Sequence, residues 1–356
     1  MISHNLNNIC DLIISRIKIK KPKKIVFSVG AQINGVPHIG TYIVIVTTFL
    51  LAKKIQQDYG FESSVKFNAY DDAPFDITKG ADGTEYQKNI VHAFEKDKYA
   101  NILNKYYITL LKDLHNATNI KYEWENYQQL QSSEKFRIQF LKSLRIRDKL
   151  GWCIAPTNGK PRIRLPKKRY RYYAQKNSEN LEILDLTKEY VQIKSKSIDG
   201  DSYISIVNKD STLDNEYVGV NGMYRSIIKE SIYTEDIREN NILMVMVKGG
   251  DWSLATEPLD WGLGIMGYRS DERPMRFFCP QIITKTGAKL SKSLIRTGDQ
   301  TMNDVPEYLT DMSIFIKKHN NYLQDLILLT ELFMSDPTHM FRSYSYEEID
   351  RLIKYQ

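Results

Sequence analysis

The sequence predicts an α/β fold built on a parallel sheet, which is split by a small β-rich insertion and followed by a short helical tail. Two apolar runs of strand length, residues 25–29 and 242–247, are each followed by glycine within two residues, as is typical of buried parallel strands. Helical stretches alternate with these runs, whereas residues 151–220 carry repeated prolines and short alternating segments. In such a sheet, ligands bind at the carboxyl ends of the strands.

The composition is that of a globular protein with room for two or three domains. The 356 residues include 50 basic and 43 acidic side chains, 18 glycines and 11 prolines, and 42% are hydrophobic. These values exclude a collagen-like, disordered or low-complexity chain. The net charge of +7 permits a polyanionic partner but does not require one.

The cysteines and the apolar segments indicate a cytoplasmic protein. Cys10, Cys153 and Cys279 lie far apart and form neither a Cys-x-x-Cys pair nor a disulfide framework, which favours a reducing compartment. The N-terminus lacks the apolar core of a signal peptide, and no window approaches 18 uninterrupted apolar residues. We therefore expect no membrane association.

The first half of the sheet should come from residues 1–150. An amphipathic helix is predicted near the N-terminus, with its apolar face formed by Leu6, Ile9, Leu12, Ile13 and Ile17. The lysines at 18–24 fit a solvated linker better than a phosphate-binding arm. Strand 25–29 is followed by a helix over 38–57, although the β-branched run 43–48 favours a strand by propensity alone. A second strand is predicted at 65–70 and two or three helices over 85–150.

The remaining chain divides into an insertion, the second half of the sheet and a tail. Prolines at 156, 161 and 166 mark the insertion, residues 151–220. Residues 221–300 should complete the sheet, with strands at 242–247 and 276–283 and a helix at 258–268. Residues 301–356 are predicted as a helical tail whose core face is leucine-rich, comprising Leu323, Leu326, Leu328, Leu329 and Leu332.

Three short stretches have the residue types of a nucleotide site. Pro37-His38-Ile39-Gly40 lies at a strand-to-helix junction, where helix amides and an imidazole can hold a phosphate and glycine leaves room for the nucleotide. Gly249-Gly250-Asp251 ends a strand, so that a ribose can lie on the backbone and donate to the carboxylate. Lys289-Leu290-Ser291-Lys292-Ser293 forms a basic loop able to neutralise a polyphosphate. Each stretch alone is more often an ordinary surface turn or loop, but the three contexts agree.

In their order, the segments PHIGT, GGDW and KLSKS resemble the signature motifs of class I aminoacyl-tRNA synthetases, whose usual forms are HIGH and KMSKS. The finer layout looks most like the class I lysyl-tRNA synthetases. These begin with an amphipathic helix, have an acidic strand end similar to Tyr70-Asp71-Asp72-Ala73-Pro74, and carry a Gly-x-Asp-His segment before the lysine loop. The resemblance covers about residues 5–300 and implies a Rossmann-like catalytic core.

The resemblance implies activation of an amino acid by ATP, with Mg²⁺, to an aminoacyl-adenylate. His38 and Thr41 would contact the phosphates, and Lys289 and Lys292 would stabilise the charged transition state. Asp251 would hold the ribose, and Asp71 or Asp72 would hold the α-ammonium group, although either aspartate alone is as well explained by a turn or helix cap. The remaining expected contacts with ATP come from Gly40, Gly249, Gly250, Ser291 and Ser293.

The sequence departs from the family pattern at several places. Thr41 replaces the second histidine of HIGH, and Trp252 replaces the histidine after the ribose aspartate. Cys153 is the single cysteine of the insertion, so no structural zinc is expected. Residues 294–356 are too few for the large helical anticodon-recognition domain of the lysyl family. The acceptor is therefore left open between tRNA and a small molecule or peptide.

A basic stretch at 162–171 bears on that choice. Its cations alternate with tyrosines, which suits a phosphate backbone and unstacked bases such as a tRNA acceptor end; an exposed edge strand protected by charge explains it better. The members are Arg162, Arg164, Lys167, Lys168, Arg169, Tyr170, Arg171, Tyr172 and Tyr173.

Two other classes of function stay open. A nucleotidyltransferase can share the His-x-Gly phosphate site, but the KLSKS segment after a Gly-Gly-Asp strand end disfavours it. A non-catalytic regulator of synthetase-like fold is suggested by Thr41, Trp252 and the short C-terminal region. The sequence decides neither the amino acid, lysine or another, nor the oligomeric state.

Overall fold

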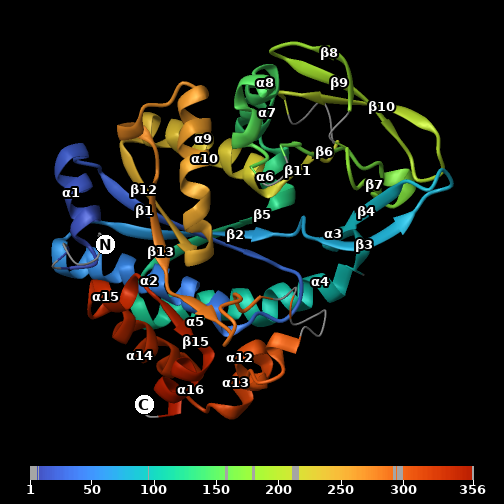
Figure 1. The fold of residues 1–356 in the computed structure, drawn as a ribbon. Coiled ribbons are helices and arrows are strands. Elements are labelled where there is room, and N and C mark those ends of the chain that lie inside the picture. Colours follow the sequence, from blue (N-terminus) through green and yellow to red (C-terminus); the bar gives the residue numbers. More distant parts are fainter. Residues whose placement is uncertain are drawn as a thin grey trace.

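The computed structural model describes residue 6 and residues 8–94, 96–156, 159–178, 181–210, 216–291, 294 and 300–354. Its centre is a five-stranded sheet in the order β13-β12-β1-β2-β5, in which every neighbouring pair is parallel (Figure 1). The strands are β1 (Lys24–Gln32), β2 (Ser63–Tyr70), β5 (Lys121–Asn126), β12 (Ile242–Gly249) and β13 (Met275–Cys279). The predicted α/β class is confirmed.

The strand order reverses next to β1. From β1 the chain moves outward through β2 to β5, and it then returns to the other side of β1 to form β12 and β13. In such sheets a crevice opens beyond the carboxyl ends of the strands at the reversal. The fold therefore predicts a ligand site beyond the ends of β1 and β12, where His38 and Gly249 follow.

The sheet is buried on both faces. Along β12, Leu243, Val245 and Val247 belong to one hydrophobic core, and the alternating Met244 and Met246 belong to the other. Both sets are at most 2% exposed. This explains why residues 242–247 read as one continuous apolar run rather than as an alternating strand.

One face of the sheet carries the helices that precede β5 in the chain. These are α1 (Asp11–Lys20), α2 (Ile39–Tyr59), α3 (Ile90–Ala93), α4 (Lys96–Ile102) and α5 (Thr109–Thr118), with a π-helical turn at Leu103–Ile108. The helix predicted over 38–57 is confirmed as α2 despite its β-branched run. Within the described chain α2 alone has the length and apolarity of a membrane-spanning helix, but 67% of that window is buried, as expected for a core helix under a sheet.

Two expectations for the first half need correction. Leu12 is not on the buried face of α1 but 50% exposed, whereas Ile9, Ile13 and Ile17 are buried. Residues 85–150 are not purely helical, because they also contain β4 (Glu85–Asn89) and the edge strand β5. The polar sequence of β5 obscured it: Lys121, Glu123 and Trp124 are exposed, as an edge strand allows.

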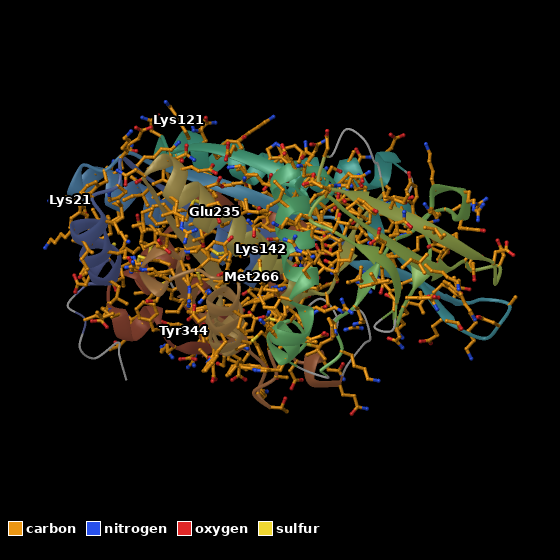
Figure 2. All side chains as sticks on the ribbon, turned by 90° about the horizontal axis from the view of Figure 1, so that it is seen from above. Lys21, Lys121, Lys142, Glu235, Met266 and Tyr344 are labelled. Carbon is orange, nitrogen blue, oxygen red and sulfur yellow. The ribbon has the colours of Figure 1, made fainter. Side chains whose placement is uncertain are left out.

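The other face is covered by a second helical layer. It consists of α6 (Tyr127–Ser132), α7 (Glu134–Arg145), α8 (Arg147–Leu150), α9 (Gly222–Asn240) and α10 (Thr256–Ile265). Figure 2 shows Lys142, Glu235 and Met266 in this layer. Short 3₁₀ turns at Gly151–Cys153, Gly250–Ala255 and Ser270–Glu272 connect it to its neighbours.

A β-rich region projects beside this layer (Figure 1). It contains β6 (Ile163–Arg164), β7 (Ala174–Gln175), β8 (Glu182–Leu186), β9 (Tyr190–Lys196), β10 (Ser202–Asn208) and β11 (Gly219–Val220), with a 3₁₀ turn at Lys168–Tyr170. The hairpin of β3 (Pro74–Lys79) and β4, which lies far earlier in the chain, joins it by pairing with β7. The domain boundaries proposed from the sequence stay predictions.

The C-terminal residues pack on the hydrophobic core that contains Leu243, Val245 and Val247 of β12. They form α12 (Glu307–Thr310), α13 (Met312–Lys318), α14 (Tyr322–Met334), α15 (Pro337–Met340), β15 (Ser343–Ser345) and α16 (Tyr346–Lys354), after a 3₁₀ turn at Gln300–Met302. α14 contacts α2, with Leu326 and Leu329 fully buried and Leu323 partly buried. The prediction was wrong for Leu328 and Leu332, which are 38% and 37% exposed.

The strand predicted over 276–283 is broken into two. β13 ends at Cys279, and β14 (Gln281–Ile283) leaves the main sheet to pair with β15. Pro280 stands between them, and a proline has no backbone N–H to donate to a central sheet. The break turns the chain from the sheet toward the lysine loop.

Candidate nucleotide and amino-acid site

A cavity of about 410 Å³ opens beyond the carboxyl ends of β1 and β12, at the reversal of the strand order. All three predicted motifs reach its wall. The lining includes His38, Gly40, Thr41, Gly249, Gly250, Asp251, Lys289, Leu290 and Ser291. Residues from both halves of the chain, separated by the whole insertion, are thus brought together as the sequence predicted.

His38 precedes the N-terminus of α2. It has an extended backbone, with φ −93° and ψ 165°, and its carbonyl accepts from the Thr41 amide at 3.0 Å. The imidazole folds over Gly40, where a Cβ would lie 3.0 Å from its Cε1 atom. Gly40 thus lets the ring lie against the helix terminus. The free amides and positive dipole end of α2 favour an anion there.

The Gly-Gly-Asp segment follows β12. The chain turns from the strand into the 3₁₀ helix Gly250–Ala255, and a Cβ at Gly250 would lie 3.0 Å from the Cys279 carbonyl oxygen. Glycine at position 250 therefore lets the end of β12 lie close to the end of β13. This turn presents Asp251 and Trp252 on the cavity wall.

Lys289 is delivered by a tight hairpin after β14. The Thr284 amide donates to the Ala288 carbonyl, the Leu290 amide donates to Ile282, and Gly287 supplies a φ of +81° that other residues rarely adopt. The buried Leu290 anchors the returning arm. Lys292 and Ser293, the remaining predicted residues of this motif, lie outside the described residues.

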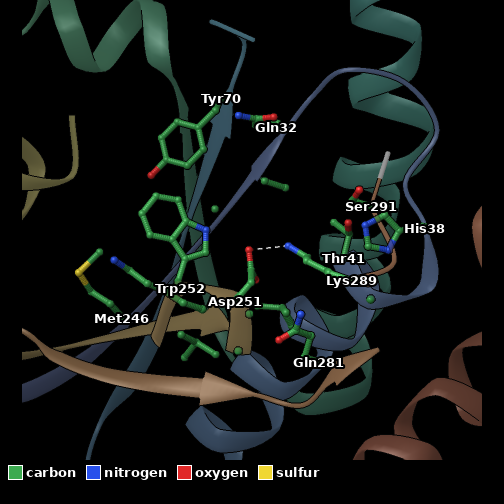
Figure 3. A pocket seen from close by; sticks show the side chains of 18 of the residues that line it. Gln32, His38, Thr41, Tyr70, Met246, Asp251, Trp252, Gln281, Lys289 and Ser291 are labelled. Carbon is green, nitrogen blue, oxygen red and sulfur yellow. Dashed lines mark ion pairs between the residues drawn. The ribbon is translucent and has the colours of Figure 1, made fainter. Parts of the chain in front are cut away.

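Lys289 and Asp251 form an ion pair across the cavity, with 2.5 Å between Nζ and Oδ2 (Figure 3). Their side chains are 39% and 29% exposed, so both groups are accessible to a ligand. The residue expected to bind a ribose and the residue expected to bind phosphate thus hold each other in this structure.

Asp71 and Asp72 do not line the cavity. Both follow β2 and are buried, and Asp72 is ion-paired with Arg225, which itself reaches the cavity wall. Burial, with the adjacent charge of Asp72, raises the pKa of Asp71 to about 7. The strand-end position was predicted correctly, but the structure does not bring these carboxylates to the ligand side.

The inner end of the cavity contains residues that sequence reasoning missed. Tyr70, Arg225, Lys229 and Lys248 line this end together with Trp252. The Arg225 guanidinium lies 4.3 Å from the centroid of the Tyr70 ring, and the Lys229 ammonium donates to the Tyr70 hydroxyl. Lys248 lies 5.0 Å from the Trp252 ring centroid. The sequence carries one signal for this group: the cations Arg225 and Lys229 lie four residues apart in the segment that forms α9.

Two of these cations are balanced by carboxylates. Lys248 pairs at 2.9 Å with Glu230, which is fully buried and also pairs with Arg276 at 2.5 Å. Burial alone would raise the pKa of Glu230, but the charges of Lys248 and Arg276 outweigh it and hold that pKa at about 2. Arg225 pairs with Asp72.

The basic stretch at 162–171 is divided between residues that contact the protein and residues that are exposed. Arg164 donates to the Gln87 side chain at 2.8 Å, and Lys167 is ion-paired with Glu216. Only Ile163–Arg164 is strand, so the prediction of an edge strand along the whole stretch was wrong. Lys168, Arg169 and Arg171 are exposed.

Metal ligands are sparse in the part of the chain that the structure describes. No group of three or more histidine, cysteine or acidic side chains could hold a metal ion there. The three cysteines are buried and unbridged, and burial raises the pKa of the Cys10 thiol to about 12.

No protein-family model matches the chain, and neither does any curated protein. Among solved structures, the tyrosyl-tRNA synthetase of Archaeoglobus fulgidus complexed with L-tyrosine is similar, with a TM-score of 0.40, 12% identity, and coverage of 96% of this chain and 92% of that one. A putative arginyl-tRNA synthetase of Campylobacter jejuni has a TM-score of 0.31 and 10% identity, with 79% and 62% covered. These are similarities of fold alone.

Proposed function

We propose that this chain activates an amino acid with ATP, forming an aminoacyl-adenylate and pyrophosphate, and transfers the aminoacyl group to an acceptor. The observation that carries the proposal is the convergence of the three motifs on one cavity at the reversal of the strand order. Separate surface turns would have no reason to meet there.

The chemistry asks mainly for positioning and for stabilisation of negative charge. A carboxylate oxygen of the amino acid attacks the α-phosphorus, the bond to the pyrophosphate oxygen breaks, and pyrophosphate leaves with the bonding electrons. Asp251 accepts from the ribose hydroxyls, which frees Lys289 from its ion pair to face the phosphates. His38 and Thr41 donate to phosphate oxygens at the start of α2. Lys292 and Ser293 would act from the same loop as Lys289.

Mg²⁺, when bound with ATP, would neutralise phosphate charge. The described residues supply no cluster of acidic ligands for it. Consequently His38 and Lys289 would carry the protein's share of that neutralisation.

The acceptor and the amino acid are finer questions. The exposed Lys168, Arg169 and Arg171 support a tRNA acceptor through sequence-independent phosphate contacts, but a small molecule or peptide fits the same chemistry. The resemblance to the lysyl family makes lysine the first amino acid to consider.

Exchange of pyrophosphate into ATP, measured with each of the twenty amino acids, tests the proposal. Exchange that depends on one amino acid and is lost in Lys289→Ala supports it; no exchange with any amino acid, alone or with total tRNA, contradicts it. Charging of total tRNA with the activated amino acid then separates the two kinds of acceptor. Transfer of a nucleotide to a phosphorylated substrate without exchange would favour the nucleotidyltransferase alternative.

A further inference from the structure

The inner end of the cavity has an excess of positive charge. Four cations line the cavity, and Asp251, already paired with Lys289, is the one carboxylate among its described lining residues. Figure 3 shows Tyr70 and Trp252 on one side of Asp251 and His38 and Ser291 on the other. The cations Arg225, Lys229 and Lys248 thus belong to the end away from the phosphate site.

Lys229 differs from its neighbours because no carboxylate of the described chain is in direct contact with it; Glu230 and Glu125 act on its charge only from beyond ion-pair distance. Arg225 is paired with Asp72, and Lys248 with Glu230. Among the described residues, Lys229 forms no ion pair, and its hydrogen bond goes to the neutral hydroxyl of Tyr70. The residue is only 5% exposed. Isolated charges of this kind are expensive to bury unless a ligand compensates them.

The position of Lys229 on α9 also indicates that a ligand compensates its charge. Arg225 and Lys229 are four residues apart, so they lie on one face of the helix, and that face lines the cavity. Like charges at this spacing destabilise a helix, and burial strengthens their repulsion. Burial removes water from the Lys229 ammonium and thereby lowers its pKa. Within the described protein the Lys229 ammonium lies over the rings of Tyr70 and Tyr233, 5.2 and 5.4 Å from their centroids, rather than against a paired carboxylate.

We infer that the amino acid taken by this site carries a carboxylate in its side chain, glutamate or aspartate, which pairs with Lys229 beside Tyr70 at the inner end of the cavity. This rests on the proposed function, because it assumes that the α-carboxylate points to the phosphate end. A lysine side chain would instead place a third positive charge between Arg225 and Lys229. The inference therefore departs from the lysine specificity that the resemblance implies.

The test compares glutamate, aspartate, lysine and the neutral amino acids in pyrophosphate exchange with the wild-type chain. We expect kcat/KM for an acidic amino acid to exceed that for lysine by about 100-fold or more, as unlike and like charges in a buried site require. A preference for lysine or for a neutral amino acid would overturn the inference while leaving the proposed function intact.

A substitution assigns the preference to one side chain. Lys229→Gln keeps a donor for Tyr70 but removes the charge, and it should raise KM for the acidic amino acid by about 100-fold with KM for ATP unchanged. Lys142→Gln is the matched control, since Lys142 lies outside the cavity in the α7 layer, 4.7 Å from the Tyr268 ring centroid (Figure 2). An unchanged KM for the acidic amino acid in Lys229→Gln would overturn the assignment.

Calorimetry without ATP separates the inference from the proposed function. Binding of glutamate or aspartate that Lys229→Gln abolishes would support the inference even if no amino acid supported exchange. Absence of both binding and exchange would overturn both. Should Lys229→Gln fail to fold, the wild-type comparison of amino acids still decides.

Discussion

The two ends of the cavity are built in different ways. At the phosphate end, His38 and Lys289 stand on loops that follow strands, Gly40 is in the first turn of α2, and Lys289 is 39% exposed. At the inner end, Arg225 and Lys229 stand on the buried face of a long helix and are at most 8% exposed. One end is accessible and held by backbone turns, whereas the other is held by a network of buried charges.

This difference separates chemistry from selection. Accessible charges can contact a phosphate as its charge develops, whereas buried charges fixed in a helix can reject a ligand of the wrong sign. Substitutions at the inner end should therefore affect stability and amino-acid choice, and substitutions at the outer end should affect turnover.

Glu230→Gln should have the largest effect on stability. It leaves Arg276 and Lys248 facing a neutral, fully buried side chain, and breaking a buried pair costs about 3–5 kcal/mol. Urea denaturation measures the loss. Glu235→Gln, five residues further along α9, weakens a partly exposed pair with Arg238 at 3.5 Å and keeps an acceptor for Tyr268; it is the control and should cost less than about 1 kcal/mol. Equal losses for the two variants would show that the buried charges behind the inner end contribute no more to stability than a partly exposed pair.

Lys289→Ala should act on turnover rather than on stability. Removing one donor to the transition-state charge typically costs about 100- to 1,000-fold in kcat. Pyrophosphate exchange under saturating ATP gives this value. Lys285→Ala, on the same hairpin but paired with Asp304 and Glu347 at the surface, should leave kcat unchanged. A similar kcat in both variants would argue against a catalytic role for Lys289.

Asp71 predicts a pH dependence of stability. Its pKa is raised to about 7 from an ordinary value of 3.8, so between these pH values the folded carboxyl keeps a proton that the unfolded one has released. Stability should therefore fall as the pH rises from 4 to 7. Asp71→Asn removes this fall, and its gain over wild type at pH 8 relative to pH 4 should be on the order of 3 kcal/mol. Parallel stability curves for the two proteins would show that Asp71 ionises normally.

Gly40→Ala should give the smallest effect. The added methyl group would meet the His38 ring at 3.0 Å and narrow the approach to the phosphate site. We expect KM for ATP to rise by about tenfold, corresponding to about 1.4 kcal/mol, with little change in the melting temperature. An unaltered KM for ATP would place the nucleotide away from this glycine.

The difference between the two ends of the cavity also explains which site residues could be predicted from the sequence. His38, Asp251 and Lys289 were found because each lies in a short segment after a strand, so local sequence alone marks it. Lys229 was missed because a lysine within a helix looks like a solvated residue until the packing of α9 buries it. Asp72 was placed at the correct strand end, but its partner Arg225 comes from the other half of the chain.

The strands likewise divide into those that the sequence could predict and those that it could not. Strands with continuous apolar runs, β1 and β12, were predicted because burial on both faces leaves a local signal. The edge strand β5 was missed because it buries little, and the pairing of β4 with β7 depends on segments far apart in the chain. Neither feature has a pattern within its own residues.

The most direct test is a crystal structure with an unreactive aminoacyl-adenylate analogue of an acidic amino acid. We expect the ribose hydroxyls at Asp251, the phosphate-like linker between His38 and Lys289, and the side-chain carboxylate at Lys229. We also expect the 2.5 Å ion pair between Lys289 and Asp251 to be broken. An analogue bound elsewhere, or bound with its side chain away from Tyr70 and Lys229, would contradict it.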